Sequence, residues 1–180
     1  PKTSCRSVPG LLAAGTGLGE CILFWNGSRY QAMPSEGGHA DFAPNNDNEI
    51  ELLRHLRSNY LHVSYERVLS GPGLHAIYDY VRDSKKNEPT WLSEEIKAGN
   101  PAAVIAAAGL KGQADIAKQA LDLFASIYGA EAGNLALKAM ALNGVYLGGG
   151  IAPKLLAKLK DGTFMKAFTN KGRYKRLMTS

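Results

Sequence analysis

Short apolar runs separated by glycine turns open the chain, and this pattern predicts β-strands. Residues 8–14 are apolar and lead into Gly15-Thr16-Gly17-Leu18-Gly19. Two strand-like runs, 20–25 and 28–33, flank Asn26-Gly27, which is the strongest short-range signal for a β-hairpin. The chain is therefore expected to begin with strands joined by tight turns.

From residue 49 onward the spacing of apolar residues becomes helical. Asn48 ends a loop rich in Asn, Asp and Pro, and it is expected to cap a helix over 49–57 whose apolar face holds Ile50, Leu53 and Leu56. A second helix is expected to start after Ser64, to be interrupted at Gly71-Pro72-Gly73, and to resume over 74–81. A polar loop over 83–89 is expected to follow.

The second half of the chain is predicted to be mainly helical. Ser93 can cap a short helix over 94–98, and Asn100-Pro101 combines an N-cap with a first-turn proline for an alanine-rich helix ending at Leu110. A long helical region covers 113–142, although Gly129 and Gly133 weaken the case for one continuous helix.

One more strand is predicted near the end, over 145–147, before two helices over 154–160 and 163–168. Strands, helices, one strand and further helices in this order predict an α/β or α+β fold with a mixed sheet.

Length and composition narrow the class of protein. The chain has 180 residues, 45% hydrophobic and 21% charged, which fits one globular domain or half of a two-domain protein and excludes disorder. The longest apolar stretch, 102–108, is too short for a membrane helix, and no secretory leader is recognisable. Because the sequence starts at Pro1, we expect it to be a fragment.

Charge and cysteines add two minor expectations. The net charge is +5, and residues 151–180 hold eight Lys or Arg and one Asp, which fits a solvated basic face or a nucleic-acid or phosphate surface. Cys5 and Cys21 lie in no zinc-binding spacing. We expect two free thiols, which could be neighbours on adjacent strands.

Two glycine-rich turns are candidates for binding phosphate. Glycines in Gly15-Thr16-Gly17 allow the backbone to approach an anion, and Thr16 adds a hydroxyl donor. The turn lacks a Walker lysine and the GxGxxG spacing, so a plain hairpin turn is the alternative. Gly148-Gly149-Gly150 stands between a predicted strand and a predicted helix, where a ligand can lie against the backbone.

Two stretches carry candidate sugar-binding side chains. In Glu36-Gly37-Gly38-His39, a carboxylate that accepts two hydrogen bonds and an imidazole that donates and accepts are separated by flexible glycines. Glu66 opens a predicted helix, where complementing the helix dipole is the alternative role. Each stretch has an ordinary structural explanation when taken alone.

Taken together, these motifs make the chain resemble bacterial glucokinase, in the group outside the zinc-containing repressor–kinase (ROK) family. The resemblance covers nearly the whole chain, and the matching text comprises Gly15-Thr16-Gly17-Leu18-Gly19, residues 36–44, residues 66–74, and Gly148-Gly149-Gly150-Ile151-Ala152-Pro153. The resemblance implies an actin-like ATPase fold built from ribonuclease-H-like domains. It also implies that residues 1–180 are the larger, C-terminal domain of a two-domain sugar kinase, without the N-terminal domain and the extreme C-terminus.

The resemblance further implies a role for each motif. Glu36, His39 and Glu66 match the glucose ligands of the family. Gly15, Thr16 and Gly17 match its second phosphate turn, and Gly149 and Gly150 match the glycines against the adenosine. No catalytic residue and no metal ligand is expected in this chain, since the general-base Asp of the family belongs to the N-terminal domain.

The implied activity is transfer of the ATP γ-phosphoryl group to the 6-hydroxyl of glucose, which feeds glycolysis. ATP and Mg²⁺ are the implied cofactors, and a cytoplasmic homodimer without nucleic-acid or membrane partners is expected. Two rival hypotheses stay open: a non-enzymatic sugar-sensing or kinase-related regulatory domain, and nucleic-acid binding through residues 171–176.

Overall fold

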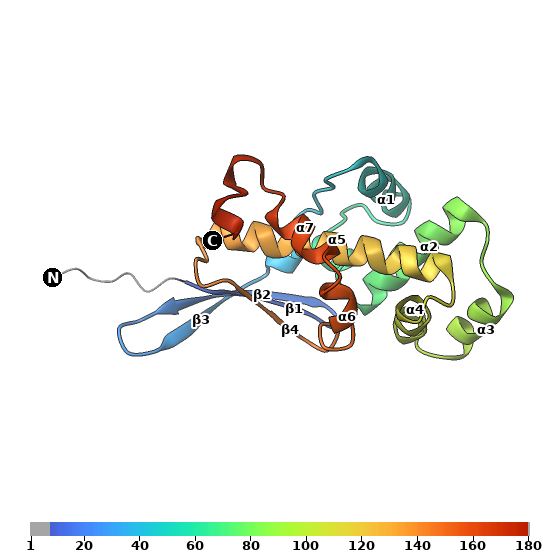
Figure 1. The fold of residues 1–180 in the computed structure, drawn as a ribbon, viewed down its shortest axis with the longest axis horizontal. Coiled ribbons are helices and arrows are strands. Elements are labelled where there is room, and N and C mark those ends of the chain that lie inside the picture. The colour runs from blue at the N-terminus through green and yellow to red at the C-terminus, as the bar shows by residue number, and fades with distance from the viewer. Residues whose placement is uncertain (1–7, 180) are drawn as a thin grey trace.

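A computed structural model describes residues 8–179 and contains a four-stranded mixed sheet (Figure 1). The strands are β1 (Gly10–Ala14), β2 (Leu18–Trp25), β3 (Tyr30–Ser35) and β4 (Val145–Gly148), in the order β3-β2-β1-β4. Strand β1 is antiparallel to β2 and parallel to β4, so it is the central strand that joins the two distant parts of the chain. The predicted mixed sheet and the predicted hairpin between β2 and β3 are both confirmed.

Seven α-helices and four short 3₁₀ turns are present among residues 8–179. The helices are α1 (Asp47–Arg57), α2 (Gly71–Lys85), α3 (Thr90–Ala98), α4 (Pro101–Leu110), α5 (Asp115–Ala139), α6 (Leu156–Leu159) and α7 (Thr163–Thr169). The 3₁₀ turns are η1 (Gly37–His39), η2 (Tyr65–Arg67), η3 (Gly172–Tyr174) and η4 (Leu177–Thr179). None of these helices is both long enough and apolar enough to cross a bilayer.

Helix α2 begins where the sequence predicted an interruption. The Ser70 hydroxyl accepts a hydrogen bond from Gly73 N at 3.0 Å, so Ser70 is the N-cap and Pro72 lies in the first turn. The prediction of one helix broken at Gly71-Pro72-Gly73 was wrong, since these residues start a helix instead. This helix also extends to Lys85, into the segment predicted as a polar loop.

Two further helix boundaries and one buried-face position were predicted wrongly. Asn46 caps α1 by accepting from Glu49 N, whereas Asn48 lies inside the helix, and Ile50 is 37% exposed rather than part of the buried face. Helix α3 starts at Thr90, before the predicted cap Ser93. The predicted cap of α4 is confirmed, because the Asn100 side chain accepts from Ala103 N.

Helix α5 is the centre of the core and runs unbroken through both of its glycines. A Cβ at Gly129 would lie 2.1 Å from Phe164 O, and one at Gly133 would lie 2.6 Å from Phe168 O. The two glycines therefore let α7 pack directly on α5, rather than breaking the helix. The Tyr128 hydroxyl donates to Leu12 O on β1, which ties the helix to the sheet.

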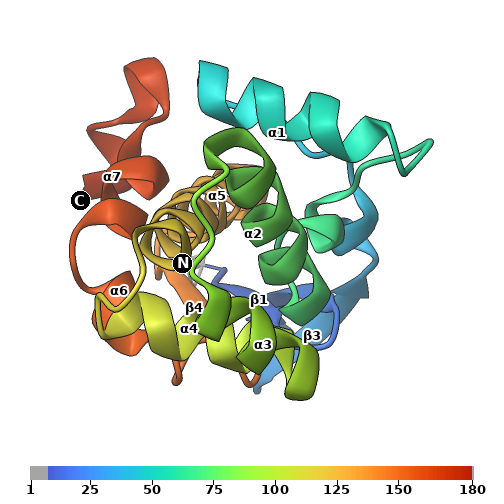
Figure 2. The same cartoon turned by 90° about the vertical axis from the view of Figure 1, so that its right-hand side faces the viewer.

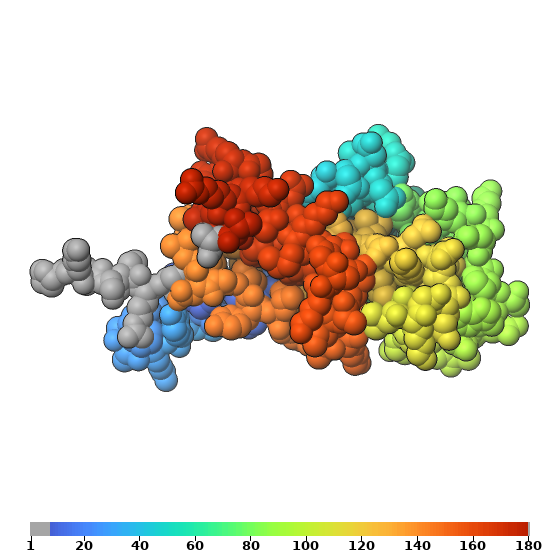
Figure 3. All heavy atoms as spheres, viewed as in Figure 1, coloured from blue at the N-terminus to red at the C-terminus, as the bar shows by residue number. Residues whose placement is uncertain are grey.

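In Figure 1, α5 and α7 lie above the sheet, whereas α3, α4 and α6 lie beyond its right-hand end. Helices α4 and α6 lie side by side in both cartoon views (Figures 1 and 2). The space-filling view shows the segments after β4, in orange and red, across the face turned to the viewer (Figure 3). The glycine turn after β1, in the first quarter of the chain, and the glycine turn after β4, in the last quarter, thus lie at the same end of the sheet.

Part of the basic C-terminal segment anchors the fold. Lys171 Nζ donates to Ala130 O at 2.8 Å and to Asn134 Oδ1 at 2.6 Å, both on α5. The prediction of a solvated basic face was therefore wrong for Lys171, which serves as a structural tie. Cys21 is a free thiol on β2, and Cys5 lies outside the described residues.

Candidate active site

Backbone hydrogen bonds fasten together the two segments that carry the candidate sugar ligands. Phe42 N donates to Val63 O at 2.9 Å, and Tyr65 N donates to Ala40 O at 3.0 Å, around an isolated antiparallel bridge between Asp41 and Ser64. The loop after β3 and the turn η2 are thereby fixed side by side. This pairing could not be read from the sequence, because neither segment has a strand-like pattern.

As a result, Glu36, His39 and Glu66 come together. His39 Nε2 lies 3.9 Å from Glu36 Oε2 and 4.0 Å from Glu66 Oε1. The Glu36 and His39 side chains are 91% and 59% exposed, and that of Glu66 is 33% exposed. These distances exceed a normal hydrogen bond, so the polar atoms stay available to a ligand. We call these three residues the carboxylate–histidine cluster.

The turn between β1 and β2 fixes one oxygen of the Glu66 carboxylate. Its Oε2 accepts a hydrogen bond from Leu18 N at 2.9 Å, and a Cβ at Gly17 would lie 2.5 Å from the same oxygen. The Glu66 carbonyl also accepts from the Ser70 hydroxyl at 2.8 Å. With Oε2 fixed on the turn, Oε1 is left facing His39 and the open side of the cluster.

The same turn forms part of a large cavity on its other side. Gly15 N donates to Gly17 O at 2.8 Å, and Gly71 N donates to Gly15 O at 2.8 Å, which attaches the turn to the first residue of α2. Gly15 and Thr16 line the cavity, whereas Gly17 faces Glu66. The β1–β2 turn is thus the partition between the carboxylate–histidine cluster and the cavity.

The cavity has a volume of about 660 Å³ and is enclosed by the amino-terminal ends of two helices and the turn after β4. The first turns of α2 and α4 contribute Pro72 and Pro101, and the segment after β4 contributes Gly150, Ile151 and Lys154. Unpaired backbone N–H groups at helix N-termini favour anions, and a lysine adds positive charge. The cavity suits a phosphate-bearing ligand.

The two glycines after β4 have separate parts in this cavity. Gly150 lines it, and a Cβ there would meet nothing within 4 Å. Gly149 is exposed outside the cavity lining; it has φ +77°, and a Cβ there would fall 2.2 Å from Ala14 O. Gly149 therefore shapes the turn against β1, while Gly150 presents the backbone to the cavity.

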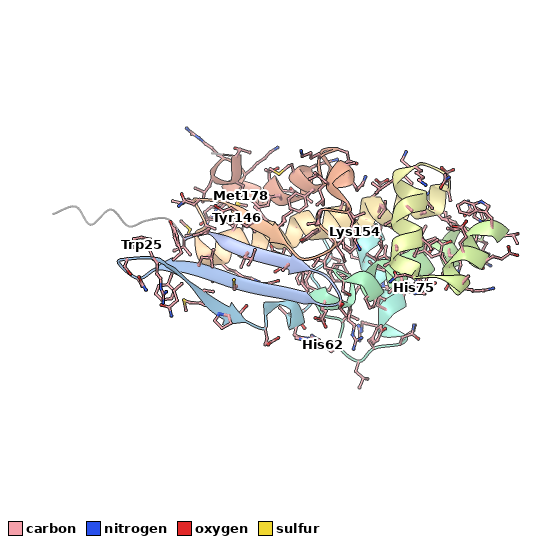
Figure 4. The ribbon with its side chains drawn as sticks, turned by 90° about the horizontal axis from the view of Figure 1, so that it is seen from below. Trp25, His62, His75, Tyr146, Lys154 and Met178 are labelled. Atoms are coloured by element: carbon pink, nitrogen blue, oxygen red, sulfur yellow. The ribbon has the colours of Figure 1, made fainter. Side chains whose placement is uncertain are left out.

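Sequence reasoning missed two polar residues that line the cavity. Neither His75 on α2 nor Lys154 was singled out from the sequence, yet both line this cavity. Figure 4 labels the two side chains. His75 Nε2 also lies 3.8 Å from Asp79 Oδ1. Only the predicted helix start at Asn100-Pro101 could have indicated that α4 forms part of the cavity wall.

The chemistry of the described residues also bears on metal binding. Within the range 8–179, no group of three or more His, Cys, Asp or Glu side chains is arranged to hold a metal ion.

Solved structures with the same arrangement define the class. The chain aligns with a glucokinase from an Antarctic psychrotroph at TM-score 0.83 and 29% identity, covering 99% of this chain and 53% of that one. A ROK family glucokinase from Streptomyces griseus, solved with glucose and AMPPNP, shares the fold at TM-score 0.62 and 18% identity, covering 97% of this chain and 52% of that one. The chain has the actin-like ATPase fold of the sugar kinases.

Sequence comparison places the chain within that class. The Glucokinase family model matches residues 2–180, and the chain belongs to this family. It is 45% identical over 183 residues to the glucokinase of Nostoc punctiforme, covering 94% of this chain and 54% of the relative. It is 41% identical to the glucokinase of Shigella sonnei, covering 90% of this chain and 48% of the relative. The chain spans about half the length of these curated relatives.

Proposed function

We propose that this chain supplies the glucose-binding carboxylates and part of the ATP site of a glucokinase. The observation that carries the proposal is the position of the β1–β2 turn. The carboxylate–histidine cluster lies on one side of this turn, and a cavity of about 660 Å³ lies on the other. A kinase needs a sugar hydroxyl and a terminal phosphate to meet, and the turn is where the two surfaces adjoin.

The cluster has the chemistry that a hexose requires. Ionised Glu36 and Glu66 can each accept hydrogen bonds from two neighbouring hydroxyls, and the His39 ring can donate to one oxygen and accept from another. Glu66 Oε2 is fixed by Leu18 N, so Glu66 has one preset oxygen to offer. A charge-assisted hydrogen bond of this kind contributes about 2 kcal/mol to binding.

The cavity has the chemistry that ATP requires. Gly15 and Thr16 offer backbone N–H groups and a hydroxyl to phosphate oxygens, and Gly150 leaves room for the nucleoside to lie against the backbone. Lys154 adds positive charge beside the amino-terminal ends of α2 and α4. Mg²⁺ bound to the phosphates would neutralise charge that builds up during transfer. Gly17 and Gly149 act indirectly, since they shape the two turns.

The transfer itself would join the two sides, with the γ-phosphoryl group passing from ATP to the glucose 6-hydroxyl. This chain would bind and orient both reactants, which is the larger part of catalysis in phosphoryl transfer. The general-base Asp implied by the resemblance would come from an N-terminal domain, and residues 1–180 would be the C-terminal domain. A homodimer in the cytoplasm stays part of this proposal.

A coupled assay of glucose 6-phosphate formation tests the proposal. The full-length protein should phosphorylate glucose with ATP, and the 180-residue chain alone should not, because it lacks the base. Glucose binding without phosphorylation by the full-length protein would support the regulatory alternative instead. Turnover by the purified 180-residue chain would show that the base lies within it.

A further inference from the structure

Two buried carboxyl groups lie directly beneath the carboxylate–histidine cluster. Glu20 on β2 is 6% exposed, and Glu131 on α5 is fully buried. Burial and the charge of Glu131 raise the pKa of the Glu20 carboxyl, and ionised carboxylates can only accept hydrogen bonds. Glu20 Oε1 and Glu131 Oε1 are buried oxygens without a hydrogen bond among the described residues, and only Glu131 Oε1 has an ion-pair partner there, Lys138 Nζ at 3.5 Å. A proton on one carboxyl would supply the missing donor.

The Glu20 carboxyl supports the turn that carries His39. A Cβ at Gly37 would lie 2.2 Å from Glu20 Oε2, so the glycine is needed for the turn to rest on this oxygen. The Ser35 hydroxyl donates to Glu20 O at 3.1 Å, and Gly37 N donates to the Ser35 hydroxyl at 3.2 Å. Any outward movement of the Glu20 side chain would push against Gly37.

The Glu131 carboxyl is connected to the other half of the cluster. Asn134 Nδ2 donates to Glu131 Oε2 at 2.8 Å and to the hydroxyl of Tyr65, which directly precedes Glu66, at 3.1 Å. Through Glu20 and Tyr65, the buried pair touches both backbone segments that hold the candidate sugar ligands.

We propose that Glu20 and Glu131 share one proton and that this buried pair positions the Gly37–His39 turn, so that loss of the proton weakens sugar binding. The inference rests on the proposed function of the cluster. Two ionised carboxylates in contact inside the protein repel each other. Glu131 is fixed within α5, so the repulsion would move Glu20 and the turn that rests on it.

The charged groups around the pair favour placing the proton on Glu20. Lys138 Nζ forms an ion pair with Glu131 at 3.5 Å from Oε1 and has no such contact with Glu20. Burial and the Glu131 charge raise the pKa of Glu20 to about 7. Burial and Glu131 also raise the pKa of Tyr65, so the phenol stays neutral, and burial lowers the pKa of Lys171 nearby. The pair therefore changes charge near neutral pH.

Calorimetric titration of the full-length protein with glucose between pH 5.5 and pH 8.5 tests the inference. The glucose Kd of the wild type should rise with pH by about fivefold or more. Glu20→Gln mimics the protonated form, so it should keep the low-pH affinity at all pH values. Glu131→Gln removes the charge that would repel ionised Glu20, so the rise in Kd with pH should disappear. Glu94→Gln, on the exposed surface of α3, is the matched control and should follow the wild type.

Comparing the wild type with Glu20→Gln separates two sources of pH dependence in glucose binding: the buried carboxyl pair and the His39 imidazole. His39 is unchanged in Glu20→Gln, so pH dependence that comes from the imidazole persists in this variant. A Glu20→Gln variant with the full pH dependence of the wild type would overturn the inference, as would a wild type whose Kd does not change with pH.

Infrared spectroscopy provides a readout that does not depend on sugar binding. The wild type at pH 6 should show the carbonyl band of a protonated carboxyl that is absent from Glu20→Gln. Absence of that band difference would overturn the shared proton, whatever the protein binds. If the band is present but the wild type binds no glucose at any pH, the proposed function fails, and with it the link between the pair and the sugar.

Discussion

The two sides of the β1–β2 turn differ in the kind of group that forms each surface. On the cluster side, the surface consists of charged side chains: Glu36, His39 and Glu66. On the cavity side, backbone and small residues dominate, with glycines at two turns and prolines at two helix starts. The first surface should be sensitive to the loss of a charge, and the second to the addition of a methyl group.

This difference follows from what each side would bind. Sugar hydroxyls are neutral and need directed acceptors, which carboxylates supply. Phosphates are charged and large, so they need close approach to backbone N–H groups, which a Cβ would obstruct. Substitutions on the two sides should therefore affect different ligands, and matched glycine variants can test the comparison.

The largest expected effect is that of Gly149→Ala. The residue has φ +77°, and the new Cβ would clash with Ala14 O, a backbone atom that cannot swing away. We expect a loss of about 3 kcal/mol or more in the free energy of unfolding, measured by urea denaturation. Gly150→Ala, where nothing lies within 4 Å, should change it by less than about 0.5 kcal/mol. Equal losses in both variants would contradict the geometry.

The next effect is that of Glu66→Gln on the sugar side. The amide oxygen can still accept from Leu18 N, but the charge that faces the sugar is lost. A loss of about 2 kcal/mol corresponds to a rise of about 30-fold in the KM for glucose. The KM for ATP should stay within about twofold in steady-state assays of the full-length protein. An unchanged glucose KM would remove Glu66 from the site.

Glu20→Gln should stabilise the protein in a pH-dependent manner. The native Glu20 keeps its proton up to about pH 7, whereas the ordinary pKa is 4.5, so the wild type loses stability as pH rises between these values. The variant has no such loss. Its advantage in urea denaturation should grow from pH 5 to pH 7 and level off at about 2 kcal/mol, which allows for partial solvent screening. A constant difference across this range would contradict a shared proton.

The smallest expected effect is the contrast between Gly17→Ala and Gly15→Ala. The Gly17 methyl would displace the Glu66 carboxylate, whereas the Gly15 methyl would meet no protein atom within 4 Å and would point into free space. Gly17→Ala should raise the KM for glucose about tenfold. Gly15→Ala should leave the KM for glucose unchanged and should weaken the binding of ATP. The same shift in both kinetic constants for both variants would show that the turn does not separate the two ligands.

The sequence predicted those parts of the fold that depend on local signals. The hairpin at Asn26-Gly27, the cap at Asn100 and the mixed sheet are confirmed. Gly71-Pro72-Gly73 was misinterpreted because glycine and proline oppose a helix interior, while the same residues suit a helix start after the Ser70 cap.

The contacts that build the candidate site were harder to predict because they are tertiary. The motifs gave the cluster residues, but the Asp41–Ser64 bridge that brings them together leaves no local pattern. Glu131 lies within a helical pattern, and only the tertiary fold buries it beside Glu20. Lys154 and His75 likewise become cavity residues only when two distant segments meet.

The most direct test is a crystal structure of the full-length protein with glucose and AMPPNP. We expect sugar hydroxyls within hydrogen-bonding distance of Glu36, His39 and Glu66, and phosphates against Gly15 and Thr16 on the opposite side of the turn. A sugar bound away from these three side chains, or a nucleotide outside the cavity beside Lys154, would contradict the account.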